Sequence, residues 1–415
     1  NLTLPNTITG GTVLSLNPLY NVTWNGGTTV PPIVEVPTGG TSDPMTLRPG
    51  ETLDLSSGTI SFTATSGTSA STISVVNNPV SIGSVASVEI KSGTLELSGA
   101  VTGQGAVKKE SDGTLVLSGT NTYSGGTEVD GGLLVAKNGS ALGSGSVQLG
   151  TSGALVLNPV SGGTVMTLSN SIAGSGKLLV GGSGKVVLTG SNNAYTGGTD
   201  LSGGTLEIQS TGALGTGAVK VGSAASLSVN KESGQVTLSN TLSGGGELLK
   251  SGSGTLVVTG TNTLANGTAL KAGTLQVSSA ANIGASLSLA GGQLALAGSS
   301  TTTGTSSSGA PISVTVEAVV VVPVPVTVGG DVAINVGNGG GVLSGTISGS
   351  GTLTKQGAAA LTVSGNMSVL AGQTLTVSGA QSGANGLTKS GSGTVVWTGA
   401  GSLQGTMAVD AGSFS

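Results

Sequence analysis

Two acidic residues, Glu128 and Asp130, are the strongest candidates for chemistry in this chain. They stand two positions apart, so in a strand both carboxylates would lie on the same face. A pair of carboxylates on one face is what hydrolysis of a glycosidic bond requires. The repeat copies described below carry different residues at these two positions, namely Asp200, Ser202, Ala269 and Lys271. Such drift is typical of a solvated face, and we predict no catalytic pair here.

Other chemical motifs are also missing. The chain has no histidine and no cysteine, which removes thiolate metal ligands, disulfides and most general acid–base chemistry. The GGSGK stretch ending at Lys185 lacks the spacing of a phosphate-binding loop, because Leu179 and Val186 stand where glycine and Ser/Thr are needed. The nonapeptide of calcium-binding rolls is absent as well. We therefore predict a protein that is not an enzyme, with no catalytic, cofactor-binding or metal-binding residues and no cofactor.

Charged residues are few, with 13 basic and 17 acidic side chains in 415 residues and a net charge of -4. Lys108 and Lys109 stand beside Glu110 and Asp112, which we interpret as local charge balance. Binding to nucleic acid requires clustered Lys and Arg, so no nucleic-acid partner is expected. No apolar run reaches the roughly 18 residues of a membrane helix, and no transmembrane segment is expected.

A repeated unit organises most of the chain. It runs from Gly103 to Val135, returns at Gly174 and Gly244, and has shorter relatives that begin at Gly349 and Gly383. A unit that returns at a nearly fixed period indicates a stacked repeat architecture. Short strands such as GTLVLSG alternate Leu or Val with Ser, Thr or Glu, which sends the apolar side chains to one face. With coils of roughly 19–24 residues, this pattern predicts an all-β chain folded as a parallel β-helix, or β-solenoid.

Four regions follow from the positions of the repeat. Residues 1–86 lack it and hold eight of the 12 prolines, which predicts a distinct N-terminal β cap or extended arm. Residues 87–298 form a solenoid of three repeats of about 70 residues. Residues 299–330 combine a Ser/Thr-rich exposed loop with a Pro/Val-rich insertion, interpreted as a hairpin on its own solenoid or a segment that pairs with another chain. Pro323 and Pro325 belong at an edge or outside the coil. Residues 331–415 resume the solenoid coils.

The repeat resembles the passenger-associated transport repeat of bacterial autotransporter proteins. GTLVLSG at residues 113–119 and NTYSGGT at residues 121–127 carry the likeness, together with the preceding lysine and glycines. The resemblance implies a right-handed parallel β-helix that is secreted or displayed at the bacterial cell surface. Such proteins usually continue into an outer-membrane barrel, which this chain lacks before Ser415. We expect either a passenger separated from its barrel or a free-standing secreted protein, and the start at Asn1 fits a mature, exported product.

Aromatic residues are scarce, and Tyr123 and Tyr195 occupy matching repeat positions. We interpret them as anchors that cover a Gly-Gly turn, in preference to a ligand-binding stripe.

Three functions are compatible with these observations. The preferred hypothesis is an extracellular structural protein whose solenoids assemble head to tail into a filament, with the N-terminal segment complementing the next subunit. The alternative is a monomeric adhesin that contacts a surface or carbohydrate ligand, and a carbohydrate-active enzyme is the weakest of the three. The candidate assembly or interface residues are Leu2, Leu4, Ile8, Val319, Val320, Val321, Val322, Trp397 and Phe414.

Overall fold

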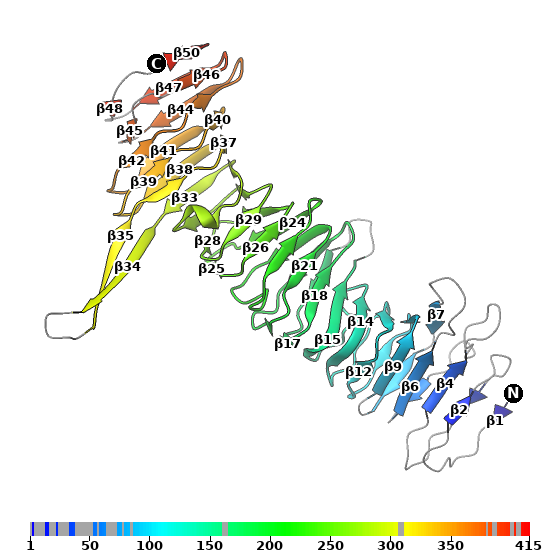
Figure 1. Ribbon diagram of the computed structural model, residues 1–415. Helices are drawn as coiled ribbons and strands as arrows, with labels where there is room; N and C mark the ends of the chain where they lie inside the picture. The colour runs from blue at the N-terminus through cyan, green and yellow to red at the C-terminus, as the bar shows by residue number, and fades with distance from the viewer. Residues whose placement is uncertain are drawn as a thin grey trace. The chain divides into compact units, whose positions relative to one another are not determined.

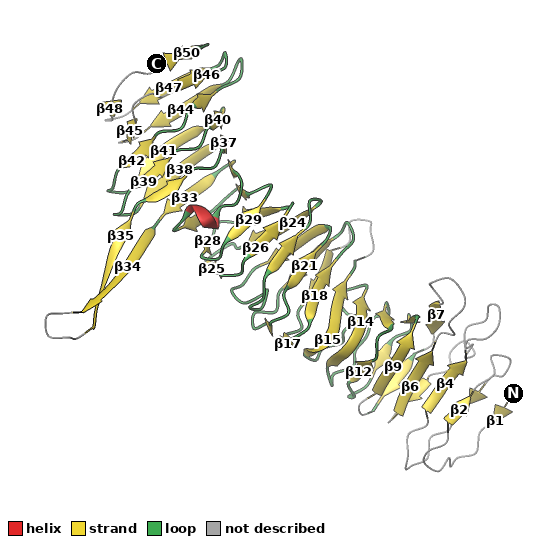
Figure 2. Ribbon diagram, viewed as in Figure 1, coloured by secondary structure: helices red, strands yellow, loops and turns green. Residues whose placement is uncertain are grey.

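The computed structural model describes most of the chain after residue 86. The described residues are 2–3, 13–15, 22–23, 33–37, 53–55, 58–63, 73–76, 79–83, 86–159, 165–305, 311–378, 381–383, 388–398, 402–403 and 408–415. The described strands stack as a parallel β-solenoid of about 14 turns, which confirms the predicted fold class. Over the described residues Figure 2 shows mostly strands, and a short 3-10 helix, η1, covers Ala280–Asn282.

The chain divides into two compact units. Unit 1 contains residues 1–206 and 212–218, and unit 2 contains residues 207–211 and 219–415. No helix among the described residues combines the length and the hydropathy needed to cross a membrane.

Unit 1 builds each rung, or turn of the solenoid, from short strands on successive faces. The strands of the first face are β2 (Val13–Ser15), β4 (Ile33–Pro37), β6 (Gly58–Thr63), β9 (Ala86–Ser92), β12 (Val107–Glu110), β17 (Ile172–Gly174) and β20 (Ala194–Tyr195). Those of the second are β7 (Ile73–Val76), β10 (Thr94–Leu97), β13 (Thr114–Leu117), β18 (Lys177–Val180) and β21 (Thr199–Leu201), while β14 (Thr127–Ala136) and β15 (Val147–Leu157) serve both faces. The remaining strands are β1 (Leu2–Thr3), β3 (Val22–Thr23), β5 (Leu53–Leu55), β8 (Val80–Ile82), β11 (Val101–Thr102), β16 (Val165–Leu168) and β19 (Lys185–Leu188), and β22 (Gly204–Ile208) spans the division between the units.

The described strands before residue 86 take part in the same stacking. Val13 pairs in parallel with Ile33, and β6 pairs in parallel with β9. These strands are therefore rungs that precede the recognisable repeat.

Unit 2 continues the pattern on three faces. One face holds β24 (Ala225–Asn230), β27 (Glu247–Ser251), β30 (Thr268–Leu270), β32 (Leu287–Leu289), β37 (Val326–Val328), β40 (Ile347–Gly349), β43 (Met367–Ser368), β46 (Thr388–Ser390) and β49 (Ala408–Val409). A nine-stranded sheet holds β25 (Gln235–Leu238), β28 (Thr255–Val258), β31 (Thr274–Val277), β33 (Gly292–Leu296), β38 (Asp331–Val336), β41 (Thr352–Gln356), β44 (Thr374–Ser378), β47 (Thr394–Thr398) and β50 (Ser413–Phe414). The third face holds β23 (Val219–Val221), β26 (Leu242–Gly244) and β29 (Asn262–Leu264), then β36 (Val320–Val322), β39 (Gly341–Leu343), β42 (Leu361–Val363), β45 (Gln381–Gly383) and β48 (Ser402–Leu403).

Inward side chains form columns in which each residue lies on its counterpart in the next rung. In unit 1, Leu115, Leu134, Leu155 and Leu178 are successive partners and are all fully buried. The alternation seen in the sequence is the cause, because every second residue of a strand points to the same side. Burying such a leucine is worth roughly 2 kcal/mol, so the columns supply the main stabilisation of the stack.

The segment between β33 and β36 leaves the regular rungs. β34 (Gly298–Thr305) and β35 (Pro311–Ala318) pair antiparallel, and Figure 1 shows this hairpin projecting from the strands of unit 2. The expected Ser/Thr-rich loop is thus largely a strand. Coil strands return at Val320, earlier than the predicted 331, and Pro323 and Pro325 lie exposed in the turn between β36 and β37.

Candidate interaction surfaces and repeat turns

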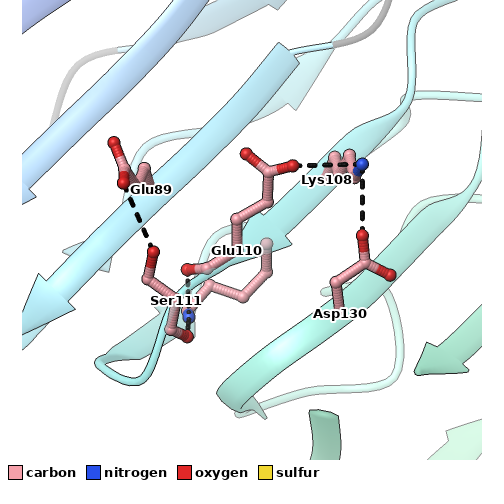
Figure 3. Close-up of polar contacts among 6 residues, drawn as sticks. Glu89, Lys108, Glu110, Ser111 and Asp130 are labelled. Atoms are coloured by element: carbon pink, nitrogen blue, oxygen red, sulfur yellow. Dashed lines mark hydrogen bonds and ion pairs between the residues drawn. The ribbon is translucent and has the colours of Figure 1, made fainter. Parts of the chain in front are cut away.

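The acidic pair Glu128 and Asp130 lies on an outward face of unit 1. The Lys108 ammonium lies 3.0 Å from a Glu110 carboxylate oxygen and 3.1 Å from one of Asp130 (Figure 3). These two hydrogen bonds raise the pKa of Lys108, with the contact to Glu110 making the larger contribution. Asp130 is therefore neutralised by a neighbour in the preceding rung, and Glu128 is exposed. The arrangement is a solvated ion-pair cluster.

The same surface extends one rung toward the N-terminus. The Ser111 hydroxyl donates to Glu89 at 3.4 Å, as Figure 3 also shows. Within the described residues, no group of three or more acidic side chains is arranged to hold a metal ion.

The repeat turns contain a buried polar network that the sequence only partly indicated. Tyr123 is fully buried, and its hydroxyl lies 2.7 Å from the Thr127 hydroxyl. Burial raises the pKa of Tyr123 to about 12. Asn121 accepts the backbone N–H of Val101 at 2.8 Å and donates to the Ala141 carbonyl at 2.6 Å, so its amide joins the rungs on both sides.

The second repeat copy reproduces this network residue for residue. Tyr195 lies 2.7 Å from Thr199, and Asn193 accepts from Ile172 and donates to Ala213. The prediction of a turn anchor agrees with the surroundings of both tyrosines, since a Cβ at Gly143, with φ of 59°, would collide with the Tyr123 carbonyl.

In the third copy, different side chains form the hydrogen bonds of the turn. Leu264 stands where the tyrosine would be, and Asn262 donates directly to the Thr268 hydroxyl at 3.1 Å. Thr268 in turn donates to the Ile283 carbonyl at 2.7 Å. All these side chains face the interior, so they stabilise the turns and form no ligand-binding stripe.

The valines proposed as interface residues divide into two sets. Val320 and Val322 are 1% and 0% exposed and belong to the core, because they occupy the inward positions of β36. Val319 and Val321 point outward and are 56% and 42% exposed. The interface hypothesis therefore keeps only the outward two, which directly follow the end of the hairpin at Ala318.

The other proposed interface residues are less well defined. Trp397 and Phe414 have ring centroids 6.4 Å apart, and the Trp397 indole N–H is buried with no hydrogen-bond partner among the described residues. Leu2 lies in β1, which pairs with β3. Leu4 and Ile8 lie outside the described residues.

Comparison with known protein families identifies the repeat. The passenger-associated-transport-repeat family matches residues 107–136, 180–208, 248–277 and 387–415. Each match covers one of the copies whose strands stack here as rungs. The β-solenoid thus carries passenger-associated transport repeats, and the resemblance found in the sequence is confirmed.

One curated relative matches part of the chain. It is the adhesin BmaC autotransporter of Brucella suis biovar 1 (strain 1330), 35% identical over 108 residues. The match spans 26% of this chain and 3% of that much longer protein. No solved structure matches.

Proposed function

We propose that this chain is a non-catalytic, surface-displayed adhesive passenger that contacts its ligand through the insertion in unit 2. The observation that carries the proposal is the exposed valine pair, Val319 and Val321, at the root of the β34–β35 hairpin. Exposed apolar side chains beside a projecting element are a common form of binding surface. The adhesin match and the passenger repeats support the same function.

A binding assay tests this proposal. Fluorescent chain is incubated with epithelial cells, and V319S/V321S is compared with V165S, which alters another exposed valine, 51% exposed in β16 of unit 1. We expect V319S/V321S to lose most of its cell binding, at least about fivefold, because two buried contacts of this size are worth roughly 1–3 kcal/mol. Equal binding by both variants would exclude the insertion as the contact surface.

A second candidate is self-assembly into a surface filament, the structural function favoured by the sequence. The unpaired Trp397 indole N–H beside Phe414, and the half-exposed Val409, favour a contact with another copy. In this version the N-terminal strands, including Leu2, would complete the contact. Deleting residues 1–30 and imaging the product by electron microscopy tests it, because fibres of unchanged length distribution would rule out the N-terminal segment as the donor.

A further inference from the structure

Three lysines are fully buried in the interior of the stack. Lys109, Lys250 and Lys389 are each 0% exposed. Each occupies an inward column position that its rung neighbours fill with apolar residues. Those neighbours are Val88 and Val129 for Lys109, Val229 and Leu270 for Lys250, and Met367 and Val409 for Lys389. A charged side chain at such a position needs a full set of hydrogen-bond partners.

Each ammonium group finds three backbone carbonyls. Lys109 donates to Glu110 and Ser111 at 2.7 Å each, and to Gly131 at 3.0 Å. Lys250 donates to Ser251 at 2.5 Å, Gly252 at 2.6 Å and Ala272 at 3.2 Å. Lys389 donates to Gly391, and to Gly393 and Ala411 at 2.6 Å each. Two carbonyls come from the lysine's own turn and the third from the next rung.

A glycine with positive φ stands in the next rung at each of the three lysines. It stands three residues beyond the lysine's strand partner, at Gly132, Gly273 and Gly412, with φ of 62°, 70° and 74°. A Cβ on Gly273 would lie 2.8 Å from the Lys250 Nζ atom, and one on Gly412 would collide with Lys389 Nζ. These positions require glycine for the positive φ and for the space.

Lys355 is a fourth lysine at this place in the motif, but the rung that follows it is longer and the lysine is less buried. It occupies the same place in the sequence motif, but Thr354 pairs with Ser378, 24 residues further on, whereas the partners of the three buried lysines follow after 20. Lys355 is only half-buried and donates to the Gly357 carbonyl in its own turn. Burial of the ammonium thus depends on the spacing of the following rung.

From these observations we propose that Lys109 acts as a register pin, a buried lysine that admits only one rung as the neighbour on its C-terminal side. Stacking of Leu and Val distinguishes poorly between rungs, because similar columns recur in every copy. Lys250 does not select in this way, because Gly292 stands three residues beyond Leu289 in the following rung, as Gly273 does beyond Leu270. For Lys109, the following rung has Ser152 three residues beyond Leu149, so a slipped pairing would leave the ammonium buried with an incomplete set of acceptors. A buried polar group that selects register in this way has precedent in coiled coils. The proposal does not depend on the adhesive function.

Engineered cysteine pairs can report the register directly, since the chain has no cysteine of its own. T114C/L133C joins strand partners of β13 and β14. T114C/A154C joins residues two rungs apart, roughly 10 Å, which is too far for a disulfide unless the rung of Leu133 is skipped. Each pair is placed in the otherwise unchanged chain and in K109V, which copies the valine found at Val180 of the second repeat. The protein is refolded from denaturant and then oxidised.

We expect K109V to increase the fraction of the T114C/A154C disulfide at least about fivefold, because the pin no longer penalises the slipped pairing. K355V, which alters the half-buried lysine, should leave that fraction unchanged. The proposal is overturned if K109V forms only the native T114C/L133C disulfide, with the yield of the unchanged chain. A K109V chain that does not fold at all would also overturn it, since the pin is proposed to select the register and not to supply the stability.

Discussion

The repeat turns and the insertion of unit 2 use their side chains in opposite ways. In the turns, the polar residues point inward and complete hydrogen bonds between successive rungs, as Asn121 and Lys109 do. In the insertion, the apolar residues Val319 and Val321 point outward. The comparison separates two kinds of information. Buried polar groups recur because they define the stack, while the exposed Val319 and Val321 lie beside the hairpin, where stacking does not require them.

The largest effect is expected from introducing a new buried lysine at a turn that resembles those around Lys109, Lys250 and Lys389. Val180 occupies the lysine position of the second repeat, and its partner Leu201 follows after 21 residues, one more than for the buried lysines. Gly204, three residues beyond Leu201, already has a φ of 69°. We expect V180K to fold with a change of about 1 kcal/mol or less. L178K introduces the charge at a fully buried position two residues earlier, where no set of backbone carbonyls faces it. The free energy of unfolding should fall by about 4 kcal/mol or more. Urea unfolding followed by circular dichroism measures both, and equal losses would show that the turn does not select lysine.

Removing a buried amide should have the next largest effect. Asn262 donates to Thr268 and Ile283, each at 3.1 Å, and accepts from Leu264 at 3.0 Å. We expect N262A to lower the free energy of unfolding by about 2–3 kcal/mol, since the partners remain buried. N266A, at an exposed position of the same copy, is the control and should change stability by about 0.5 kcal/mol at most.

The tyrosine hydroxyl should contribute less. Y195F removes the contact with Thr199 but keeps the ring that fills the turn. The expected loss is about 1–2 kcal/mol, with T196A at an exposed neighbour as the control. A loss no larger than that of T196A would mean that the ring alone anchors the turn.

The burial of Lys109 also predicts that the stability of the fold depends on pH. Burial lowers the pKa of Lys109 from 10.5 to about 8, against the opposing influence of Asp112 and Glu110. Between these two pH values the unfolded chain binds more protons than the folded one, so the free energy of unfolding should rise with pH. The expected rise is about 1 kcal/mol between pH 8 and pH 9, and K109M should remove it. A slope that persists in K109M would assign the titration to another group.

The outward ion pairs should contribute least to the free energy of unfolding. K108Q breaks the contacts with Glu110 and Asp130, whose side chains are 37% and 41% exposed. A loss of about 0.5 kcal/mol or less is expected, decreasing as salt is added. K177Q, which breaks the exposed pair with Asp200, provides the comparison. A loss above that of Y195F would contradict the division between inward and outward groups.

The alternation of Leu and Val and the spacing of the glycines were sufficient to predict the solenoid, because period-2 burial is a local property of each strand. The sequence does not reveal that Lys109, Lys250 and Lys389 are buried. Lys109 was interpreted as charge balance with Glu110 and Asp112, although it keeps the inward phase of Val107. Its partner Gly131 lies 22 residues further on, and this distant contact is visible only when the length of the intervening rung is known.

The insertion was harder to interpret for another reason. Ser and Thr in β34 show no apolar alternation, so the sequence predicts a loop, although the threonines favour extended backbone. Val320 and Val322 were grouped with their outward neighbours because all four residues are valine. Composition alone cannot assign a face when every position in a run is apolar.

The pairing of each rung with only its neighbours has a consequence for how such a chain changes in length. Exchange between two repeat copies of about 70 residues would add or remove three whole rungs, and only the rungs at the junction would meet a new neighbour, the equivalent rung of another copy. In unit 2 such an event would carry the hairpin about 14 Å along the stack, since rungs are spaced about 4.8 Å apart, while it stayed on the same face. Genetic recombination could therefore adjust the reach of the insertion in fixed steps without altering a single contact at its root.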